Sequence, residues 1–443
     1  MKIQLSEHFT YKKLLRFTAP SIAMMIFTSI YGVVDGFFVS NYVGKTSFAA
    51  VNFIMPFLQI LGTAGFMLGT GGSALVAKTM GEGNHEKAKR LFSLFIYVTF
   101  LCGIVIGIIG VFCIRPIASV LGAEGQMLKG CMDYGRCILL ALPFFMLQFE
   151  FQSFFVAAEK PQLGFFMTVA SGVMNMILDA LFMAVFEWGL IGAAAATAIS
   201  QTTGAALALA YFFRPNTSLL RLTKTKFDAR ALLQASVNGS SELMTGISMS
   251  LVSMLYNMQL MKYAGEGGVA AYGVLMYVGM IFFSAFIGYS VGTAPIVSYH
   301  YGAGGHGELK NLLKKSSVII GVFSFCMLVL SEFLAWPLSA MFVGYDEELM
   351  RLTLRGFQIF SFSFLLAGVP IYGSSFFTAL NNGLVSAFIS FLRTLVFQIA
   401  AVLILPVFLG IDGIWLSIVL AEFLAVLITI FFVFRMQGKY HYL

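Results

Sequence analysis

The chain has 443 residues, of which 59% are hydrophobic and only 11% are charged, and its formal net charge is +7. Soluble domains contain about 45–50% apolar and about 25% charged residues, so this composition excludes an ordinary soluble globule. The basic residues are scattered among short segments instead of forming one patch, so the positive charge does not indicate a nucleic-acid partner.

Apolar runs long enough to cross a membrane follow one another along the whole chain. A transmembrane helix needs roughly 20 apolar residues, and interruptions by Gly, Pro, Asn or charge divide the chain into twelve such runs. We therefore predict an all-α polytopic membrane protein that contacts membrane lipid, expected to be a monomer. The predicted spans are 14–38, 47–77, 91–113, 133–157, 163–186, 190–213, 233–261, 269–298, 314–335, 353–380, 384–408 and 413–435.

The loops between these spans predict the orientation. Assigning loops alternately to the two membrane faces puts nineteen of the 27 Lys and Arg residues on one face and six on the other. The positive-inside rule then predicts that both termini are cytoplasmic, in the cell inner (plasma) membrane. Trp188, Trp336 and Trp415 all fall at the predicted outer interface, where an amphipathic ring is favoured.

Enzymatic motifs are missing from the sequence. The five cysteines form no CxxC pair, and the five histidines lie near the termini or in predicted loops. We expect no tightly bound cofactor, no disulfide framework and no enzymatic activity. The chain also lacks a Walker A motif, so ATP is not the expected energy source.

The two halves of the chain resemble each other. YVGKTSFAA from Tyr42 matches YAGEGGVAA from Tyr263, and VAKTMGEGNHEKAKRL from Val76 matches VSYHYGAGGHGELKNL from Val297, both at an offset of 221. Each half holds six spans, an even number, which predicts two six-helix lobes related by a parallel repeat with substrate sites between them. The expected division is an N-terminal lobe over 1–213, a cytoplasmic connector over 214–232 and a C-terminal lobe over 233–443.

Acidic side chains inside the predicted spans are candidates for function. An ionised group at the bilayer centre costs at least about 2.5–3.5 kcal/mol on insertion scales. Asp35 and Asp179 lie late in two spans that both run outward, and Asn175 shares a helix face with Asp179. This set predicts either a Na⁺ site of oxygen ligands or two carboxyl groups that share one proton. A purely structural pair is the third interpretation. At the offset of 221 the C-terminal half has Tyr256 and Ala400 instead.

Other polar residues in the spans give weaker predictions. Glu242 occupies the repeat position of Ser21 and is a candidate for binding a cationic substrate or a second proton. Glu422 corresponds to Gln201. Packing or hydration of a cavity is the favoured interpretation of this polar pair, and both residues are weaker candidates for substrate binding. Glu150 is expected toward the cytoplasm, in a snorkelling, capping or cavity role, and Arg393 is expected to snorkel to the inner surface.

These motifs together resemble the MATE (multidrug and toxic compound extrusion) family, in its MepA-like and DinF-like branch. The resemblance covers the whole chain and rests on the paired loops GEGNHEKAKRL and GAGGHGELKNL, on VVDGFFVSNYVG, on NMILD and on GLIGAAAATAISQ. It implies export of amphiphilic, often cationic compounds in exchange for Na⁺ or H⁺, through a V-shaped cavity between the lobes.

The resemblance also implies roles for individual residues. In that branch the cation site consists of Asp35, Asn175, Asp179 and Thr197, and a bend of the first span near Pro20 closes the cavity of the lobe. Another branch binds its ion in the C-terminal lobe, but span 353–380 has no acidic residue, so no such site is expected here. The predicted function is a multidrug antiporter that works by alternating access. A flippase of lipid-linked oligosaccharides from the same superfamily is the alternative.

Overall fold

The computed structural model describes residues 3–43, 45–120, 123–344 and 346–442. Within these ranges the chain forms α-helices and two short π-helical segments, with no strand. The elements are α1 (Tyr11–Tyr42), α2 (Lys45–Gly81), α3 (His85–Val120), α4 (Gly125–Leu140), α5 (Leu142–Ala157), α6 (Pro161–Asp179), η1 (Ala180–Val185), α7 (Gly189–Phe213), α8 (Ala229–Gly302), α9 (His306–Val343), α10 (Glu347–Ala379), α11 (Gly383–Phe391), η2 (Leu392–Val396), α12 (Phe397–Leu409) and α13 (Ile411–Tyr440).

Two elements explain how these helices give the predicted number of crossings. Ten stretches are long and apolar enough to span a membrane, and α4 and α5, bent by 60°, together make an eleventh. The 74-residue α8 is broken at Gly265 (φ 61°, ψ −154°), and the Tyr256 and Tyr272 rings on its two arms stack with centroids 5.1 Å apart. A straight helix of that length would measure about 110 Å against a hydrocarbon core of about 30 Å. α8 is therefore a hairpin that crosses twice, which gives twelve crossings as predicted.

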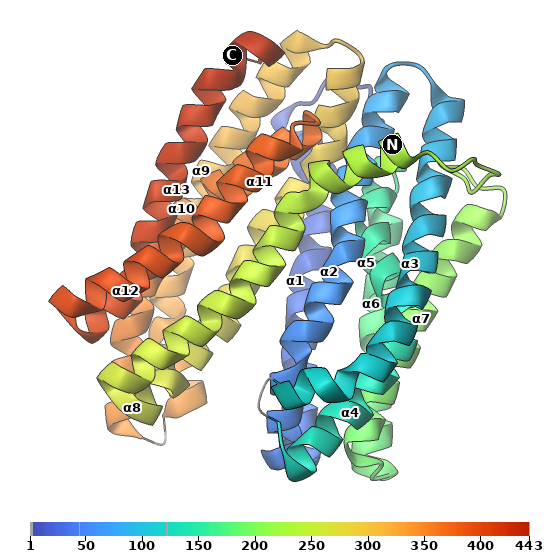
Figure 1. Cartoon of the computed structure of the whole chain (residues 1–443). Helices are drawn as coiled ribbons and strands as arrows, with labels where there is room; N and C mark the ends of the chain where they lie inside the picture. The colour runs from blue at the N-terminus through green and yellow to red at the C-terminus, as the bar shows by residue number, and fades with distance from the viewer. Residues whose placement is uncertain (1–2, 44, 121–122, 345, 443) are drawn as a thin grey trace.

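The helices form two bundles that meet at one end (Figure 1). α1–α7 make the N-terminal lobe and α8–α13 the C-terminal lobe, and both termini lie at the end where the lobes meet, which we call the terminus side. One buried apolar cluster includes residues of both lobes, among them Leu75 and Val297. Two further clusters lie within single lobes, around Ile54 in the N-terminal lobe and around Phe364 in the C-terminal lobe.

Glycines allow α2 and α8 to touch backbone to backbone at the terminus side. A Cβ atom on Gly81 would lie 2.0 Å from the Tyr299 carbonyl oxygen, and one on Gly302 would lie 2.0 Å from the Lys78 carbonyl oxygen. Deeper in the membrane Gly71 meets Gly239 in the same way. We call these backbone contacts between α2 and α8, at Gly71, Gly81, Gly239 and Gly302, the glycine seam. Toward the other end of α1, a Cβ on Gly32 or Gly36 would meet no atom within 4 Å. The two lobes are thus closed on the terminus side and diverge on the opposite side.

The segment before α1 crosses this seam. The Leu5 amide donates to Glu159 Oε1 of the N-terminal lobe (2.8 Å), and the Phe9 amide donates to Glu308 Oε1 of α9 in the C-terminal lobe (2.9 Å). His8 Nδ1 lies 2.6 Å from Glu308 Oε2. Leu5 and Phe9 are fully buried. Residues 3–10, the N-terminal strap, therefore link the two lobes on the terminus side.

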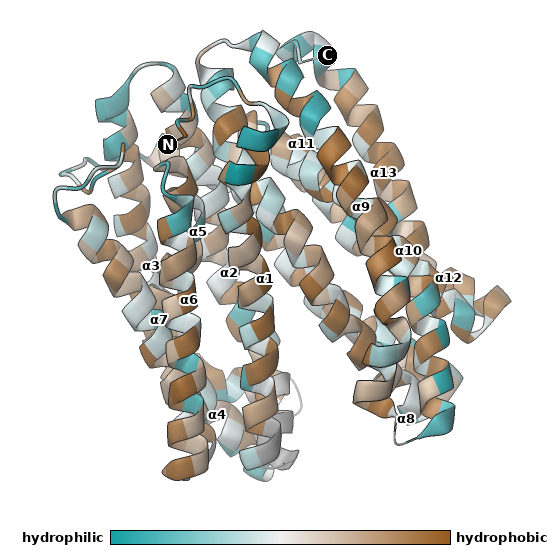
Figure 2. Cartoon of the chain, turned by 180° about the vertical axis from the view of Figure 1, so that it is seen from behind, coloured by the Kyte–Doolittle hydropathy of each residue, from teal (hydrophilic) through white to brown (hydrophobic). Residues whose placement is uncertain are grey.

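The surface pattern fits a membrane protein, with one departure from the sequence prediction. Hydrophobic residues cover much of the helices, and hydrophilic ones gather in the loops on the terminus side (Figure 2). Trp188 and Trp336 are exposed, as an interfacial ring requires. Trp415 is not interfacial, because it is 1% exposed and its ring packs where a side chain on Gly356 would stand. All five cysteines are free.

Candidate functional site

One face of α6 carries a line of buried polar side chains. Thr168, Ser171, Asn175 and Asp179 follow one another at spacings of three or four residues, which places them on the same side of a helix. All four are at most 5% exposed, and Asp179 is fully buried. Immediately after Asp179 the helix widens into the π-helical segment η1. π-helical turns of this kind are frequent at functional sites.

The Asp35 carboxyl group of α1 reaches Asp179. The two carboxyl groups are close enough to interact with each other. Oδ1 of Asp35 and both carboxyl oxygens of Asp179 are buried and have no hydrogen-bond donor among the described residues. Two ionised carboxylates at this separation and away from water repel each other strongly. A proton shared by the pair, or a bound cation, would satisfy these oxygens.

The remaining predicted oxygen and amide groups lie around this pair. Asn175 Nδ2 donates to Thr197 Oγ1 (3.5 Å), so the amide of α6 and the hydroxyl of α7 stand next to each other. Gln201, one turn along α7, donates through Nε2 to the Tyr31 hydroxyl (3.4 Å). The structure thus brings Asp35, Asn175, Asp179 and Thr197 together in the N-terminal lobe, with Gln201 close by. The carboxyl, amide and hydroxyl oxygens of this set are ligands that suit a hard cation such as Na⁺.

Two tyrosines belong to this site, although the sequence gave no reason to choose them among seventeen. Tyr134 of α4 is fully buried and its hydroxyl donates to Met55 Sδ (4.0 Å). It lies close enough to Asp35, Asp179 and Thr197 to interact with them electrostatically. Tyr31 of α1 is one turn before Asp35 and interacts with its charge. A phenol both donates and accepts hydrogen bonds, so Tyr134 suits a site that alternately holds and loses a cation.

Comparison with known proteins shows which family has this architecture. The profile of the MatE family matches residues 20–181 and, a second time, residues 243–404, one match in each lobe. The chain belongs to the MatE family. The double match also agrees with the internal repeat found in the sequence.

Relatives of this MatE chain extend along its whole length. It is 23% identical over 436 residues to the multidrug export protein MepA of Staphylococcus saprophyticus, covering 97% of this chain and 94% of that protein. A crystal structure of MATE in complex with MaL6 superimposes with a TM-score of 0.92 at 21% identity, covering 97% of both chains. A multidrug resistance MATE family transporter in an outward-facing conformation gives a TM-score of 0.91 at 21% identity and also covers 97% of both chains. The fold of this chain is the two-lobed MATE fold.

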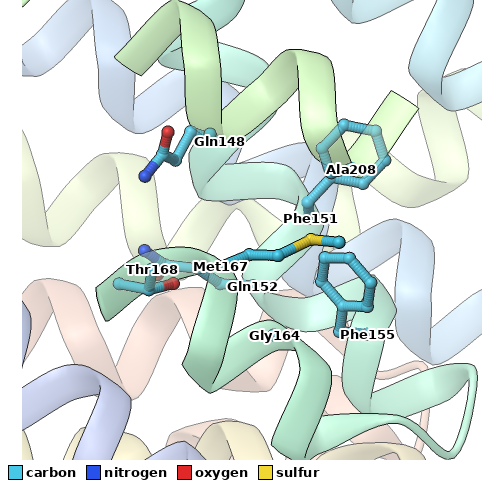
Figure 3. Close-up of a pocket in the computed structure, with 9 residues that line it drawn as sticks. Gln148, Phe151, Gln152, Phe155, Gly164, Met167, Thr168 and Ala208 are labelled. Atoms are coloured by element: carbon cyan, nitrogen blue, oxygen red, sulfur yellow. The ribbon is translucent and has the colours of Figure 1, made fainter. Parts of the chain in front are cut away.

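A small pocket lies along α6 on the terminus side of the acidic pair. It has a volume of about 10 Å³, which is room for about a single water molecule. In Figure 3 the Gln148 amide and the Thr168 hydroxyl stand at one side of the pocket, and the Phe151 and Phe155 rings at the other. Gln148 Nε2 donates to Ser171 Oγ (3.2 Å), so the polar line of α6 borders this pocket.

The C-terminal lobe of the MatE chain has a different set of interactions at the corresponding depth. The Tyr256 hydroxyl, the repeat partner of Asp35, donates to Gln398 Oε1 (2.7 Å). Both oxygens of Glu422 accept from Arg393 Nε (3.0 and 2.9 Å). Glu242 of α8 is partly buried and close enough to interact with the Arg393 charge.

Two predictions for this lobe change as a result. Arg393 does not snorkel to the surface, because its side chain is 15% exposed and is paired with a buried carboxylate. Glu422 and Gln201 do not share one role, because Glu422 is committed to that ion pair whereas Gln201 lies beside the acidic pair of the other lobe. A substrate role for Glu242 stays a prediction.

Pro20 lies inside α1, which continues as one helix from Tyr11 to Tyr42. Proline has no N–H group and its ring crowds the preceding turn, so this position weakens the helix locally. The neighbouring Ser21 carbonyl faces Gly288 of α8 across the interface between the lobes. The proposed bend at Pro20 stays a prediction, now located where α1 contacts the other lobe.

Glu150 does not snorkel either. Its side chain is 0% exposed, in the middle of α5, and neither carboxyl oxygen has a hydrogen-bond partner among the described residues. The snorkelling interpretation of this residue is therefore wrong.

Proposed function

We propose that this MatE chain is a secondary active exporter of amphiphilic, cationic drugs, driven by H⁺ or Na⁺ moving in the opposite direction. The observation that carries the proposal is the buried pair of Asp35 and Asp179, in which three of the four carboxyl oxygens are buried and lack donors among the described residues. Such a pair is costly to keep in a membrane unless it binds a cation or proton during function. The similarity to multidrug export proteins and to a multidrug resistance transporter supports the same class of substrate.

The arrangement of the lobes supports alternating access. The lobes are closed at the terminus side and diverge at the opposite side. With the termini in the cytoplasm, as the basic loops predict, this conformation faces outward and is ready to release drug. A cation that binds Asp35 and Asp179 more tightly in one conformation than in the other shifts the equilibrium between them, and this difference couples the two fluxes.

The flippase alternative requires a basic groove for an anionic lipid headgroup. Arg393, the predicted intramembrane cation of the C-terminal lobe, is neutralised by Glu422. No observation on the described residues favours that alternative.

The experiment is ethidium efflux from cells that express wild-type protein, Asp35→Asn or Asp179→Asn at equal levels. Each Asn variant keeps the shape of the side chain but removes its charge and its proton. We expect efflux to fall by about tenfold or more, since the coupling between two binding sites is typically about 1–3 kcal/mol, or about 5–150-fold. Glu348→Gln, an exposed acid at the start of α10, serves as the control and should export normally. Wild-type efflux by both Asn variants would refute the proposal.

A further inference from the structure

Glu150 is a second buried acid of the N-terminal lobe, separate from the pair at Asp35 and Asp179. It lies seven residues before the terminus-side end of α5, and Asp179 lies eighteen residues after the terminus-side start of α6. At 1.5 Å per residue these depths are about 10 Å and about 27 Å, so the two acids are roughly 16 Å apart along the membrane normal. The site already described does not include Glu150.

The surroundings of Glu150 offer it no counter-charge. The Thr99 hydroxyl of α3 is the group that interacts with its carboxyl, and Ser153, three residues further along α5, has a buried hydroxyl without a partner. The helices packed against α5 carry several charged groups, including Lys78 of α2, Arg90 and Arg115 of α3, Asp179 of α6 and Glu242 of α8. Among the described residues, none of these groups forms an ion pair with Glu150. An ionised carboxylate buried in this way is very costly, so in this conformation the group is held as a neutral acid.

Glu150 also stands directly behind the helix that closes the glycine seam. A Cβ on Gly69 of α2 would lie 2.9 Å from the Glu150 Cα atom. Two residues later, Gly71 faces the other way and touches Ala235 and Gly239 of α8. α2 is therefore held between Glu150 on one side and the C-terminal lobe on the other. If the lobes part on the terminus side, α2 loses these contacts with α8.

We propose that Glu150 is a second proton-binding site of the transport cycle, filled while the lobes are closed on the terminus side and emptied to water when they part there. The inference rests on the proposed export function. In the emptying step the carboxyl O–H bond breaks, the proton passes to water on the terminus side and the carboxylate keeps the electron pair. Before the lobes close again, the carboxylate takes up a proton from the water on the terminus side.

The first test needs no drug. Infrared spectra of the purified full-length protein should contain a C=O stretching band of a neutral carboxylic acid that is missing from Glu150→Gln and present in Glu348→Gln. Glu150→Asp, which keeps an acid at this position, should retain such a band. Size-exclusion and thermal-unfolding profiles show whether each variant is folded. Identical spectra for wild type and a folded Glu150→Gln would overturn the proposal.

The second test counts protons. Tetraphenylphosphonium, a lipophilic cation, is added to the detergent-solubilised protein in weak buffer with a pH-indicator dye. We expect Glu150→Gln to release about one proton fewer per bound cation than wild type, and Glu150→Asp and Glu348→Gln to match wild type. Equal proton release by Glu150→Gln and wild type, or no release by a wild type that exports with Na⁺, would overturn the second site and leave the export function standing. A wild type that binds no drug would refute the export function itself, and the second site with it.

Discussion

At the scale of single residues, the acidic pair depends on side chains from four helices. α1 supplies Asp35, α6 supplies Asp179 and Asn175, α7 supplies Thr197 and α4 supplies Tyr134. Because the ligands come from different helices, a change in the shape of the lobe would change their spacing. A site built in this way can bind a cation tightly in one conformation and weakly in another.

Tyr134 gives the most specific prediction at this scale. Replacing Tyr134 by Phe removes a buried hydroxyl that lies near Thr197 and both acids, and one hydrogen bond from this hydroxyl to the occupied site would contribute about 0.5–1.5 kcal/mol. We expect the Na⁺ or H⁺ concentration for half-maximal drug efflux to rise by roughly 2- to 10-fold, at unchanged expression. Tyr97→Phe, whose hydroxyl only reaches the Thr223 carbonyl at the surface (3.5 Å), is the control. An unchanged ion dependence in Tyr134→Phe would remove this residue from the site.

The ion pair between Arg393 and Glu422 predicts a difference between single and double variants. Removing one partner leaves a buried charge alone and costs about 3–5 kcal/mol, whereas replacing both by apolar residues is often neutral. Arg393→Met should therefore lower the thermal unfolding temperature in detergent much more than Arg393→Met combined with Glu422→Leu. Equal or additive losses would show that the pair does not stabilise the C-terminal lobe.

Sequence reasoning at this scale depends on the cost of burying a charged residue in the membrane. Asp35, Asp179 and Asn175 stand out because charge is expensive in a bilayer and four residues make one helical turn. Thr197 came from family resemblance, since a single hydroxyl in a span has no distinctive pattern. Tyr134 and the partner of Arg393 were missed because they come from distant spans, and no spacing along the chain links them to the residues they contact.

At the scale of elements, helix breaks decide the architecture. Gly265 adopts a positive φ that turns α8 back on itself, and the 60° bend between α4 and α5 redirects the fourth span. Hydropathy predicted both arms of α8 as separate spans because their lengths suffice. It did not predict the bend near Ala141, because a bend changes direction without changing composition.

The glycine seam predicts the effect of added side chains. Gly81→Val would place atoms against the Tyr299 carbonyl of the other lobe, so it should favour separation on the terminus side. We expect faster labelling of a cysteine introduced at Ser298, a seam residue that donates to the Ala74 carbonyl, by a membrane-impermeant maleimide in a background without native cysteines. Gly321→Val in α9, where a Cβ meets no atom within 4 Å, is the matched control. Equal labelling in both variants would contradict a role for the seam in closure.

The N-terminal strap predicts an effect of the same sign. Glu308→Gln weakens the contacts with the Phe9 amide and His8, and a hydrogen bond to a charged group contributes about 1.5–3 kcal/mol. Labelling at the Ser298 position should therefore rise, by about tenfold or more, while the unfolding temperature changes little. Glu82→Gln, an exposed acid on the same side of the membrane, should label like wild type. A strap that serves only to anchor the N-terminus would leave the labelling unchanged.

At the scale of the whole molecule, the two lobes have the same fold but different interiors. The N-terminal lobe holds two interacting carboxyl groups, of which Asp179 has no donor among the described residues. The C-terminal lobe has instead the hydrogen bond between Tyr256 and Gln398 and the ion pair of Arg393 and Glu422. The repeat was readable from the sequence because it preserves loops and small residues. Which lobe carries the ion site was predicted from the position of the acids, and it stays a prediction.

The central claim is that ion flux and drug flux are coupled through Asp35 and Asp179. The most direct measurement uses proteoliposomes of purified protein, with a Na⁺ gradient or a pH gradient imposed separately and drug movement followed in each case. We predict that one of the two gradients drives drug transport in wild type and that neither does so in Asp35→Asn or Asp179→Asn, although both variants still bind drug. Gradient-driven transport by either variant at the wild-type rate would contradict the account.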